Sequence, residues 1–123
     1  MMNSEAAPIV LLDDNLFTSA RVASALRARG RQVLVARGVE AVAACEIALI
    51  NLGSRTLNGI ELIEPLRARF PAARIFGFCG HLEVEIRRAA RAAGIDRLLT
   101  NESVAALGWL EGAGETEEPA ADA

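Results

Sequence analysis

The chain has 123 residues, of which 52% are hydrophobic but only 4% aromatic, and a formal net charge of −3. This length predicts one domain with a core that needs neither disulfides nor a structural metal. Five of the acids lie in the last thirteen residues, which contain no base, so residues 1–110 carry 13 − 11 = +2. Such a nearly neutral body gives no reason to expect a nucleic-acid or membrane partner.

Features that the sequence lacks narrow the class of protein further. The start of the chain is short and polar and does not resemble a signal peptide, and no apolar run approaches the roughly 18 residues of a membrane-spanning helix. Two cysteines, Cys45 and Cys79, are too few for a disulfide framework. We therefore expect a soluble protein of the reducing cytoplasm.

Short apolar runs alternate with segments of helical spacing along the chain. The expected strands are residues 9–12, 31–36, 47–51, 74–80 and 96–100. The expected helices are residues 15–30, 38–45, 58–70, 81–94 and 103–112. Five strands that alternate with five helices predict an α/β domain with a doubly wound parallel sheet and helices on both faces.

The helix expected at residues 58–70 contains two opposing signals. Asn58 followed by Glu61 matches a capping box with asparagine in the capping role. Pro65 removes a backbone hydrogen bond, which costs about 3 kcal/mol inside a helix. We therefore expect either a kink or a helix that starts late.

The two ends of the chain differ in composition from its body. Residues 1–7 are expected to form a flexible N-terminus, and residues 112–123 an acidic, disordered tail of small residues. The domain is expected to cover residues 8–111, without internal repeats or a second domain.

Polar residues and one cysteine stand where the expected strands end. In open α/β sheets, ligands bind beyond the carboxyl ends of the strands, at the point where the strand order reverses. The residues at these ends are Asp13, Asp14, Asn51, Cys79 and Asn101. These five residues therefore form the candidate site.

At these positions the sequence resembles the receiver domain of bacterial response regulators, of the chemotaxis-regulator-like type. The resemblance covers roughly residues 8–110 and rests on IVLLDDN at the first strand, LINL and LNGIEL after the third, ARIFGFCG at the fourth and AAGIDRLLT at the fifth. The spacing from Asn51 to Gly59 also matches the family's spacing from its phosphorylated aspartate to a loop glycine. The resemblance implies a flavodoxin-like (βα)5 fold with strand order 2-1-3-4-5.

The resemblance assigns a role to each candidate residue, but three of these roles need a different residue type. Asp13 and Asp14 match the two acids that hold Mg²⁺ in the family. Asn51 stands at the position of the phosphorylated aspartate, Cys79 at that of a Thr or Ser that contacts the phosphoryl group, and Asn101 at that of a Lys. Because the chain contains no lysine, no shift of the alignment restores that residue.

These replacements predict a loss of the phosphorylation chemistry. Phosphoryl transfer to a carboxylate needs an anionic oxygen nucleophile and cations that stabilise the transferred group. The amide of Asn51 is neutral and a very poor nucleophile. Asp13 and Asp14 could still bind Mg²⁺, but only weakly, because one of three negative charges is gone. We therefore expect a degenerate receiver, or pseudo-receiver, that is not an enzyme and has no cofactor beyond weak Mg²⁺.

Each candidate residue also has a plain structural interpretation. Asp13 and Asp14 could be a cap pair at a helix N-terminus, and Asn101 could cap the last helix. Cys79 could be a small apolar residue near the sheet edge. Alternatively it could be a redox-sensing thiol, which needs a positive charge nearby. The basic residues close to it in sequence are Arg74 and His81.

Two further residues of the site region have open interpretations. Arg55 replaces a loop proline of the family, and it could reach the pocket and pair with Asp13 or Asp14 in place of a metal. The alternative is that Arg55 is exposed to solvent. His81, the single histidine, is expected at the surface and has no Cys or His partner at a zinc-site spacing.

Receivers of the family signal through the face of the fourth helix, fifth strand and fifth helix. The corresponding residues here are Glu83, Arg87, Arg88, Arg91, Arg97, Leu98, Val104 and Trp109. Arginine and tryptophan are enriched at interface hot spots, although the arginines could simply solvate the helix. Leu98 replaces the family's aromatic switch residue, so we expect no coupling between phosphorylation and this face.

Three functions remain open. The first is a stand-alone, non-catalytic module that binds another signalling protein, or a second copy of itself, through that face. The second is a phosphorylatable receiver of a two-component phosphorelay that uses Asp13 or Asp14. The third is a redox or small-molecule sensor that uses Cys79 and the vacated pocket. DNA binding is the weakest option, because the body carries only +2 and contains no helix-turn-helix.

Overall fold

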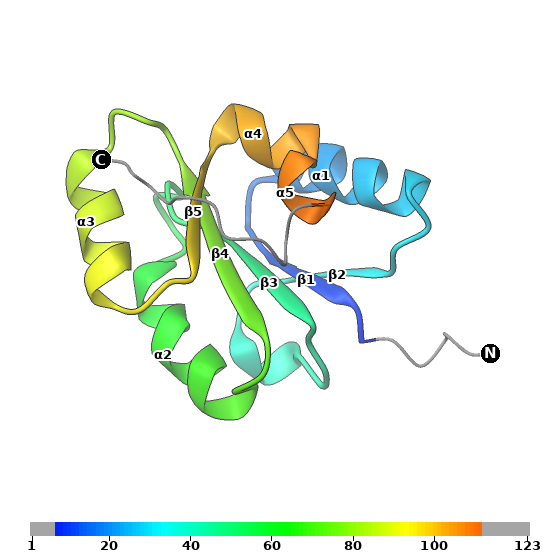
Figure 1. Ribbon diagram of the computed structural model, residues 1–123, viewed down its shortest axis with the longest axis horizontal. Helices are drawn as coiled ribbons and strands as arrows, with labels where there is room; N and C mark the ends of the chain where they lie inside the picture. Colours follow the sequence, from blue (N-terminus) through cyan, green and yellow to red (C-terminus); the bar gives the residue numbers. More distant parts are fainter. Residues whose placement is uncertain (1–6, 112–123) are drawn as a thin grey trace.

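Five parallel strands form the central sheet of this computed structural model, which describes residues 7–111 (Figure 1). The strands are β1 (Ile9–Leu12), β2 (Val33–Ala36), β3 (Ile47–Asn51), β4 (Arg74–Cys79) and β5 (Arg97–Thr100). Their order across the sheet is β2-β1-β3-β4-β5, and all neighbouring pairs are parallel. The predicted flavodoxin-like sheet is therefore confirmed. The expected acidic tail and the expected flexible start, apart from Ala7, lie outside the described residues.

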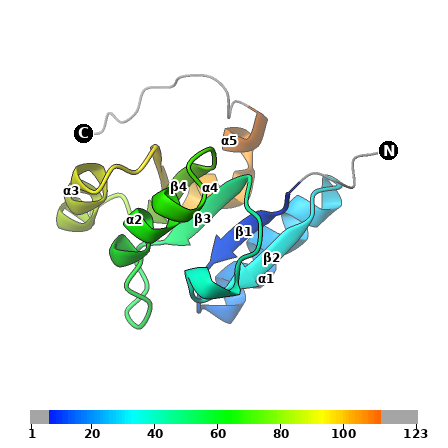
Figure 2. The same cartoon turned by 90° about the horizontal axis from the view of Figure 1, so that it is seen from below.

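Helices cover both faces of the sheet (Figures 1 and 2). One face carries α1 (Leu16–Ala28), α4 (Asn101–Ala106) and α5 (Gly108–Glu111), and the other carries η2 (Val39–Ala41), α2 (Ile60–Arg69) and α3 (Val84–Ala92). Alternate residues of β1 belong to different cores, with Ile9 and Leu11 on the first face and Val10 and Leu12 on the second. This division follows the two-residue period of a strand. Within residues 7–111, no helix is both long and apolar enough to cross a membrane.

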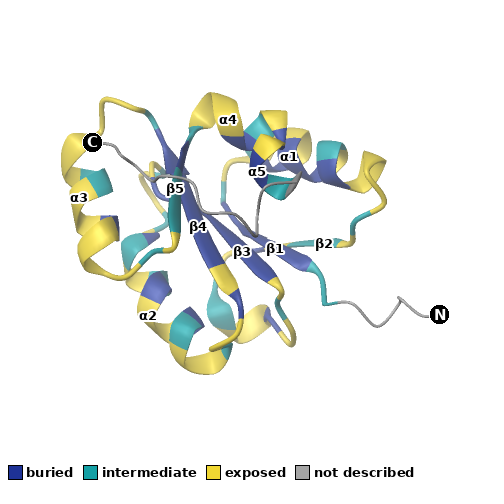
Figure 3. Cartoon of the chain, in the orientation of Figure 1, coloured by how far each residue is buried: buried dark blue, intermediate teal, exposed yellow. Residues whose placement is uncertain are grey.

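The central strands β1 and β3 are buried along their whole length (Figure 3). Both are flanked by a strand on each side and covered by helices on each face. The edge strand β2 differs, because its Val35 is exposed. Continuous apolar runs are typical of parallel strands that are buried on both faces, and the sequences IVLL and IALIN follow this pattern.

Residues 38–45 form a much shorter element than the expected helix. They contain only the 3₁₀ turn η2, which begins after Gly38, a residue without a side chain that could cap it. The backbone is extended again at Val42, whose side chain is buried in the core under α2. The helix expected over residues 38–45 is therefore wrong, and Val42 packs into the core from an extended segment.

The predicted capping box of α2 is wrong. The helix begins at Ile60, and its N-cap residue is Gly59 instead of Asn58. The helix starts two residues later than the expected Asn58, but Pro65 still lies inside it, so this start does not bring the proline into the first turn.

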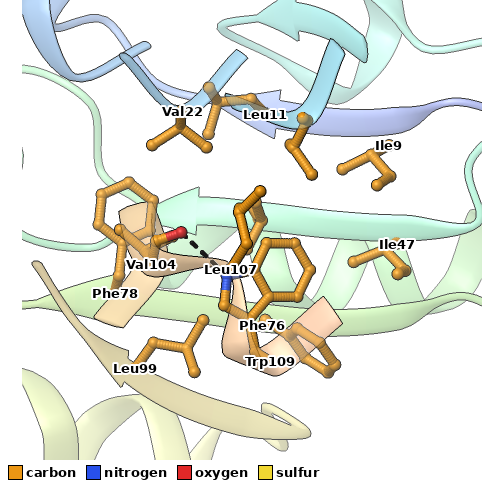
Figure 4. Packing of buried hydrophobic residues seen from close by; sticks show 12 residues of the cluster. Ile9, Leu11, Val22, Ile47, Phe76, Phe78, Leu99, Val104, Leu107 and Trp109 are labelled. Carbon is orange, nitrogen blue, oxygen red and sulfur yellow. Dashed lines mark hydrogen bonds between the residues drawn. The ribbon is translucent and has the colours of Figure 1, made fainter. Parts of the chain in front are cut away.

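The last helix is interrupted at Leu107, where a single helix over residues 103–112 was expected. Leu107 has a φ of 64° and separates α4 from α5. This left-handed conformation costs a non-glycine residue about 1–2 kcal/mol. The packing that offsets this cost is shown in Figure 4, where Leu107 and Trp109 lie among the buried residues of one core. The Trp109 indole donates a hydrogen bond to the Val104 carbonyl at 2.9 Å, and its ring meets Phe76 edge-on with centroids 5.8 Å apart.

Trp109 therefore does not lie on the expected partner face, and this part of the prediction is wrong. Only 2% of its surface is exposed, and Val104 is likewise buried. The turn at Leu107 directs the end of the chain toward the sheet, so the single tryptophan stabilises the core. The expected face keeps Glu83, its four arginines and a partly buried Leu98.

We predict that Trp109→Ala lowers the free energy of unfolding by about 3–5 kcal/mol, the range for a large aromatic removed from a core. Trp109→Phe keeps most of the volume and should cost roughly 1 kcal/mol for the lost hydrogen bond. Urea unfolding followed by circular dichroism measures both. A cost within about 0.5 kcal/mol for Trp109→Ala, as for a surface substitution, would contradict the burial.

Candidate functional site

A cavity of about 550 Å³ opens at the carboxyl end of the sheet. Its walls come from the start of α1 and from the segments that follow β1, β3, β4 and β5. The lining residues are Asp14, Asn15, Thr18, Asn51, Gly53, Ser54, Arg55, Thr56, Gly80, Glu83 and Asn101. The cavity thus brings together three of the five predicted residues. The other two lie next to it, since Asp13 is bonded to Asn51 and Cys79 ends β4.

Asn51, the last residue of β3, is hydrogen-bonded at both ends of its amide. Its Nδ2 donates to Oδ1 of Asp13 at 2.8 Å, and its Oδ1 accepts from the backbone N–H of Gly53 at 3.0 Å. These partners determine the orientation of the amide, because a carboxylate can only accept and a backbone N–H can only donate. Asn51 is 8% exposed and Asp13 is 2% exposed. The bond therefore joins the ends of β1 and β3 in a site that is shielded from water.

Asp14 is held by the loop that follows β3. The Ser54 hydroxyl donates to one carboxylate oxygen at 2.7 Å, and the Thr56 hydroxyl donates to the other. The Ser54 oxygen also accepts from the backbone N–H groups of Thr56 and Leu57, at 3.2 and 2.9 Å. The hydrogen bonds from Thr56 and Ser54 lower the pKa of Asp14, with a smaller contribution from the charge of Arg37. Asp14 is therefore ionised at neutral pH, and its charge ties the loop to β1.

The magnesium ion implied by the resemblance does not fit this arrangement. Mg²⁺ requires several oxygen ligands, but Asn51 turns its N–H toward Asp13, and both oxygens of Asp14 already accept hydroxyl hydrogens. Of the four carboxylate oxygens of Asp13 and Asp14, only Oδ2 of Asp13 has no hydrogen-bond partner among the described residues, and one such oxygen is too few for a magnesium site. In the described part of the chain, no group of three or more His, Cys, Asp or Glu side chains could hold a metal. A carboxylate in place of the amide, at the same 2.8 Å, would repel Asp13 by roughly 6 kcal/mol at an effective dielectric constant of about 20. The amide removes this repulsion without a cation.

Cys79 is fully buried at the end of β4. Its Sγ lies 3.7 Å from a guanidinium nitrogen of Arg87, which also donates to the backbone carbonyl of Leu99 at 3.3 Å. Burial raises the pKa of the Cys79 thiol, and the hydrogen bond and charge of Arg87 offset this only in part. The thiol is therefore neutral at physiological pH. Arg87 was not among the basic residues considered from the sequence, because it lies eight positions from Cys79 and reaches the thiol from the first turn of α3.

Both helix caps at the site are supplied by residues other than those predicted. The Asn15 side chain caps α1 by accepting two backbone N–H groups of its first turn, at 3.0 and 3.1 Å, so Asp13 and Asp14 are not a cap pair. Thr100 caps α4 as part of a capping box. Asn101 is instead the first residue of α4, and its exposed side chain lines the cavity.

Arg55 and His81 are both exposed. Exposure was one of the two alternatives for Arg55 and the expectation for His81. Arg55 lines the cavity, but among the described residues it forms no ion pair with Asp13 or Asp14. The hydroxyls of Ser54 and Thr56, rather than Arg55, contact the Asp14 carboxylate, so the alternative in which Arg55 pairs with Asp13 or Asp14 is wrong.

Gly59 lies where the start of α2 comes close to β3. A Cβ atom at this residue would lie 2.7 Å from a side-chain carbon of Ile50 and 3.1 Å from the carbonyl oxygen of Asn51. Any larger residue would therefore move the helix away from the end of the strand. The spacing from Asn51 to Gly59 thus has a packing reason that is independent of phosphorylation.

The sequence is similar to that of a curated regulatory protein. It is 33% identical over 99 residues to the photosynthetic apparatus regulatory protein RegA of Rhodobacter capsulatus, and the match covers 76% of this chain and 53% of that protein. The chain therefore spans about half the length of this relative. No family model matches the sequence.

Solved structures of receiver domains share the fold. The receiver domain of NtrX from Brucella abortus has a TM-score of 0.71 at 15% identity, over 87% of this chain and 99% of that one. The chemotaxis protein CheY4 of Vibrio cholerae also has a TM-score of 0.71, at 17% identity over 85% of this chain and 96% of that one. A CheY-like receiver domain from Methanospirillum hungatei has a TM-score of 0.65 at 20% identity, over 76% of this chain and 80% of that one. At these identities the likeness is one of fold.

We predict that Cys79 reacts slowly with a thiol reagent in the folded protein and quickly after unfolding in urea. Burial excludes the reagent, and the raised pKa suppresses the thiolate, so the rate should increase only when the pH exceeds the ordinary range of a thiol. The second thiol, Cys45, whose pKa burial raises to about 11, is removed by Cys45→Ser so that the signal comes from Cys79 alone. Equal rates in the folded and unfolded protein would contradict this prediction.

Proposed function

We infer that this chain, which has the fold of response-regulator receiver domains, works in signal transduction as a non-catalytic module that binds another protein. The support comes from the pocket at the carboxyl end of the sheet. There the amide of Asn51 and the carboxylates of Asp13 and Asp14 are bonded to one another or to the loop after β3. The pocket is therefore stabilised by its own side chains.

The single observation that carries the proposal is that Asn51 has a neutral amide with both ends hydrogen-bonded inside the domain. An acceptor of a phosphoryl group must be an anionic oxygen placed in line with the donor. The Asn51 amide is neutral, its nitrogen faces Asp13, and its oxygen accepts from Gly53. An attacking group at the end of β3 would have to break two hydrogen bonds and still lack a negative charge.

The residues around Asn51 support the same function. The chain contains no lysine that could stabilise the transferred oxygens. The Cys79 thiol, a weak donor, faces Arg87 inside the domain. Loss of the nucleophile and of two stabilising groups together removes more of the transition-state stabilisation than any single replacement would.

Phosphorylation of Asp14 is the second candidate function, and one observation favours it. Asp14 is ionised and only half-buried on the cavity wall, whereas Asp13 is buried beneath Asn51. Each oxygen of Asp14 nevertheless accepts a hydroxyl hydrogen, and these hydrogen bonds stabilise the anion and so make it a weaker nucleophile. A redox role for Cys79 ranks lower, because its thiol is buried and neutral.

We propose that a partner signalling protein, or a second copy of this chain, docks on the surface of α3 and β5. Without Trp109, this surface combines exposed charged residues with the apolar Val84, which is 54% exposed at the start of α3. Arg88 is exposed on α3, whereas Arg87 turns inward to Cys79 and the Leu99 carbonyl. Arginine forms bidentate hydrogen bonds with carboxylates, so an acidic partner surface fits best.

We place this role in the cytoplasm and assign it no enzymatic activity and no resident cofactor. Cys45 and Cys79 are free thiols, as is usual in a reducing compartment.

We predict that the intact mass of the native chain is unchanged after incubation with acetyl phosphate and Mg²⁺. The reason is that Asn51 supplies no anionic acceptor. An Asn51→Asp variant treated in the same way tests whether a restored carboxylate suffices, and a phosphorylatable receiver domain in the same tube confirms that the donor is active.

A phosphoryl adduct on the native chain would overturn the proposed function. An Asp14→Asn variant then locates the acceptor, because loss of the adduct in this variant would favour the second candidate. Persistence of the adduct in the Asp14→Asn variant would favour Asp13 as the acceptor.

A further inference from the structure

We infer that the Asn51 amide takes the place of a cation in this pocket, so that the native domain is independent of divalent metals and the single change Asn51→Asp makes its stability depend on one. The inference concerns the pocket on which the proposed function rests. Its readouts are stability and cation dependence rather than phosphoryl uptake, so either conclusion can fail without the other.

The first support is the geometry of the Asp13 carboxylate. Its Oδ1 accepts from the Asn51 amide at 2.8 Å and from the backbone N–H of Asn15 at 3.0 Å. Both N–H groups point their partial positive charge at this oxygen. The Asn51 N–H stands where the family's aspartate would place a second carboxylate. An N–H donor therefore provides the attraction that a bound cation provides between two acids.

The second support is the depth of the site. Asp13 is 2% exposed, and its Oδ2 is buried without a hydrogen-bond partner among the described residues. A buried anion with one unpartnered oxygen is stable only when its surroundings favour negative charge. Replacing the amide by a carboxylate would add a second buried charge next to Oδ1 of the same Asp13 side chain, and a divalent cation is the species that neutralises such a pair of carboxylates.

The third support is that protein hydroxyl groups already contact both oxygens of the Asp14 carboxylate. Its oxygens are held by the hydroxyls of Ser54 and Thr56, and the Ser54 oxygen accepts two backbone N–H groups of the same loop. Asn51 closes the other end of the loop by accepting from the backbone N–H of Gly53. The loop after β3 is thus fixed on both sides of the pocket by protein groups alone.

The test compares urea unfolding of the native chain, Asn51→Asp and Asn51→Leu, each with EDTA and with excess MgCl₂. Leucine matches the size of the replaced side chain and removes both hydrogen bonds without adding a charge. For Asn51→Asp we expect unfolding at lower urea in EDTA. Its unfolding equilibrium constant should fall on the order of 100-fold with Mg²⁺ at about 100 times its dissociation constant. For the native chain, and likewise for Asn51→Leu, the urea unfolding curve in MgCl₂ should be the same as the curve in EDTA.

A second variant separates charge from shape. In the double variant Asp13→Asn with Asn51→Asp, the amide and the carboxylate exchange places, and an N–H donor again faces a carboxylate. We expect the double variant to unfold in EDTA at a higher urea concentration than Asn51→Asp alone, and to lose the response to Mg²⁺. Recovery of this kind would show that the pairing of donor and anion, rather than the identity of residue 51, stabilises the site.

Hydrogen exchange of the Gly53, Thr56 and Leu57 amides gives an independent readout on the loop. In the native chain their exchange rates should be the same in EDTA and in Mg²⁺, because protein groups accept all three hydrogens. Stabilisation of the native chain by Mg²⁺, or slower exchange of these amides on its addition, would overturn the inference. An Asn51→Asp variant as stable as the native chain in EDTA would overturn it as well.

Discussion

The hydrogen bond between Asn51 and Asp13 joins the carboxyl ends of β3 and β1, and the arrangement of the pocket depends on it. Both strands are buried along their whole length, and Asp13 and Asn51 at their ends are only 2% and 8% exposed, so water screens a charge there only weakly. Two carboxylates in this position would repel each other strongly in so low a dielectric. An amide of nearly the same shape converts that repulsion into an attraction, and it leaves an oxygen that can bind the Gly53 backbone.

The same solution recurs at Asp14, where two hydroxyls of the loop after β3 supply the donors. Both acids at the end of β1 therefore accept hydrogen bonds from within the domain. A pocket stabilised in this way has one arrangement that is favoured without a ligand. It has little electrostatic reason to change when a phosphoryl group or a metal is offered, because a ligand shifts a conformational equilibrium only by its differential affinity.

The end of the chain shows how core packing can remove a residue from a surface. Leu107 adopts a left-handed conformation, and Trp109 consequently packs against Phe76 under the sheet. The indole N–H satisfies the Val104 carbonyl, which the interrupted helix would otherwise leave without its partner. The side chain best suited to anchor a protein contact is thus used for stability, and it is not available to the docking surface proposed on α3 and β5.

Local sequence patterns were sufficient to predict the strands, the alternation with helices and the candidate residues at the strand ends. Apolar runs indicate buried strands, and parallel strands place their carboxyl ends together, so Asp14, Asn51 and Asn101 could be expected around one cavity. The partners of these residues could not be predicted in this way. Asn51 and Asp13 are 38 positions apart, and Asp14 and Thr56 are 42 apart.

The fold class and the chemical groups at the pocket could therefore be predicted from the amino-acid order, because both follow from residue type and short-range spacing. Three features could be known only from the folded chain: the amide nitrogen of Asn51 faces Asp13, Arg87 contacts Cys79, and Trp109 is buried. These three features depend on distances between segments that are remote along the chain. Such distances are set when the whole core packs, and no local preference encodes them.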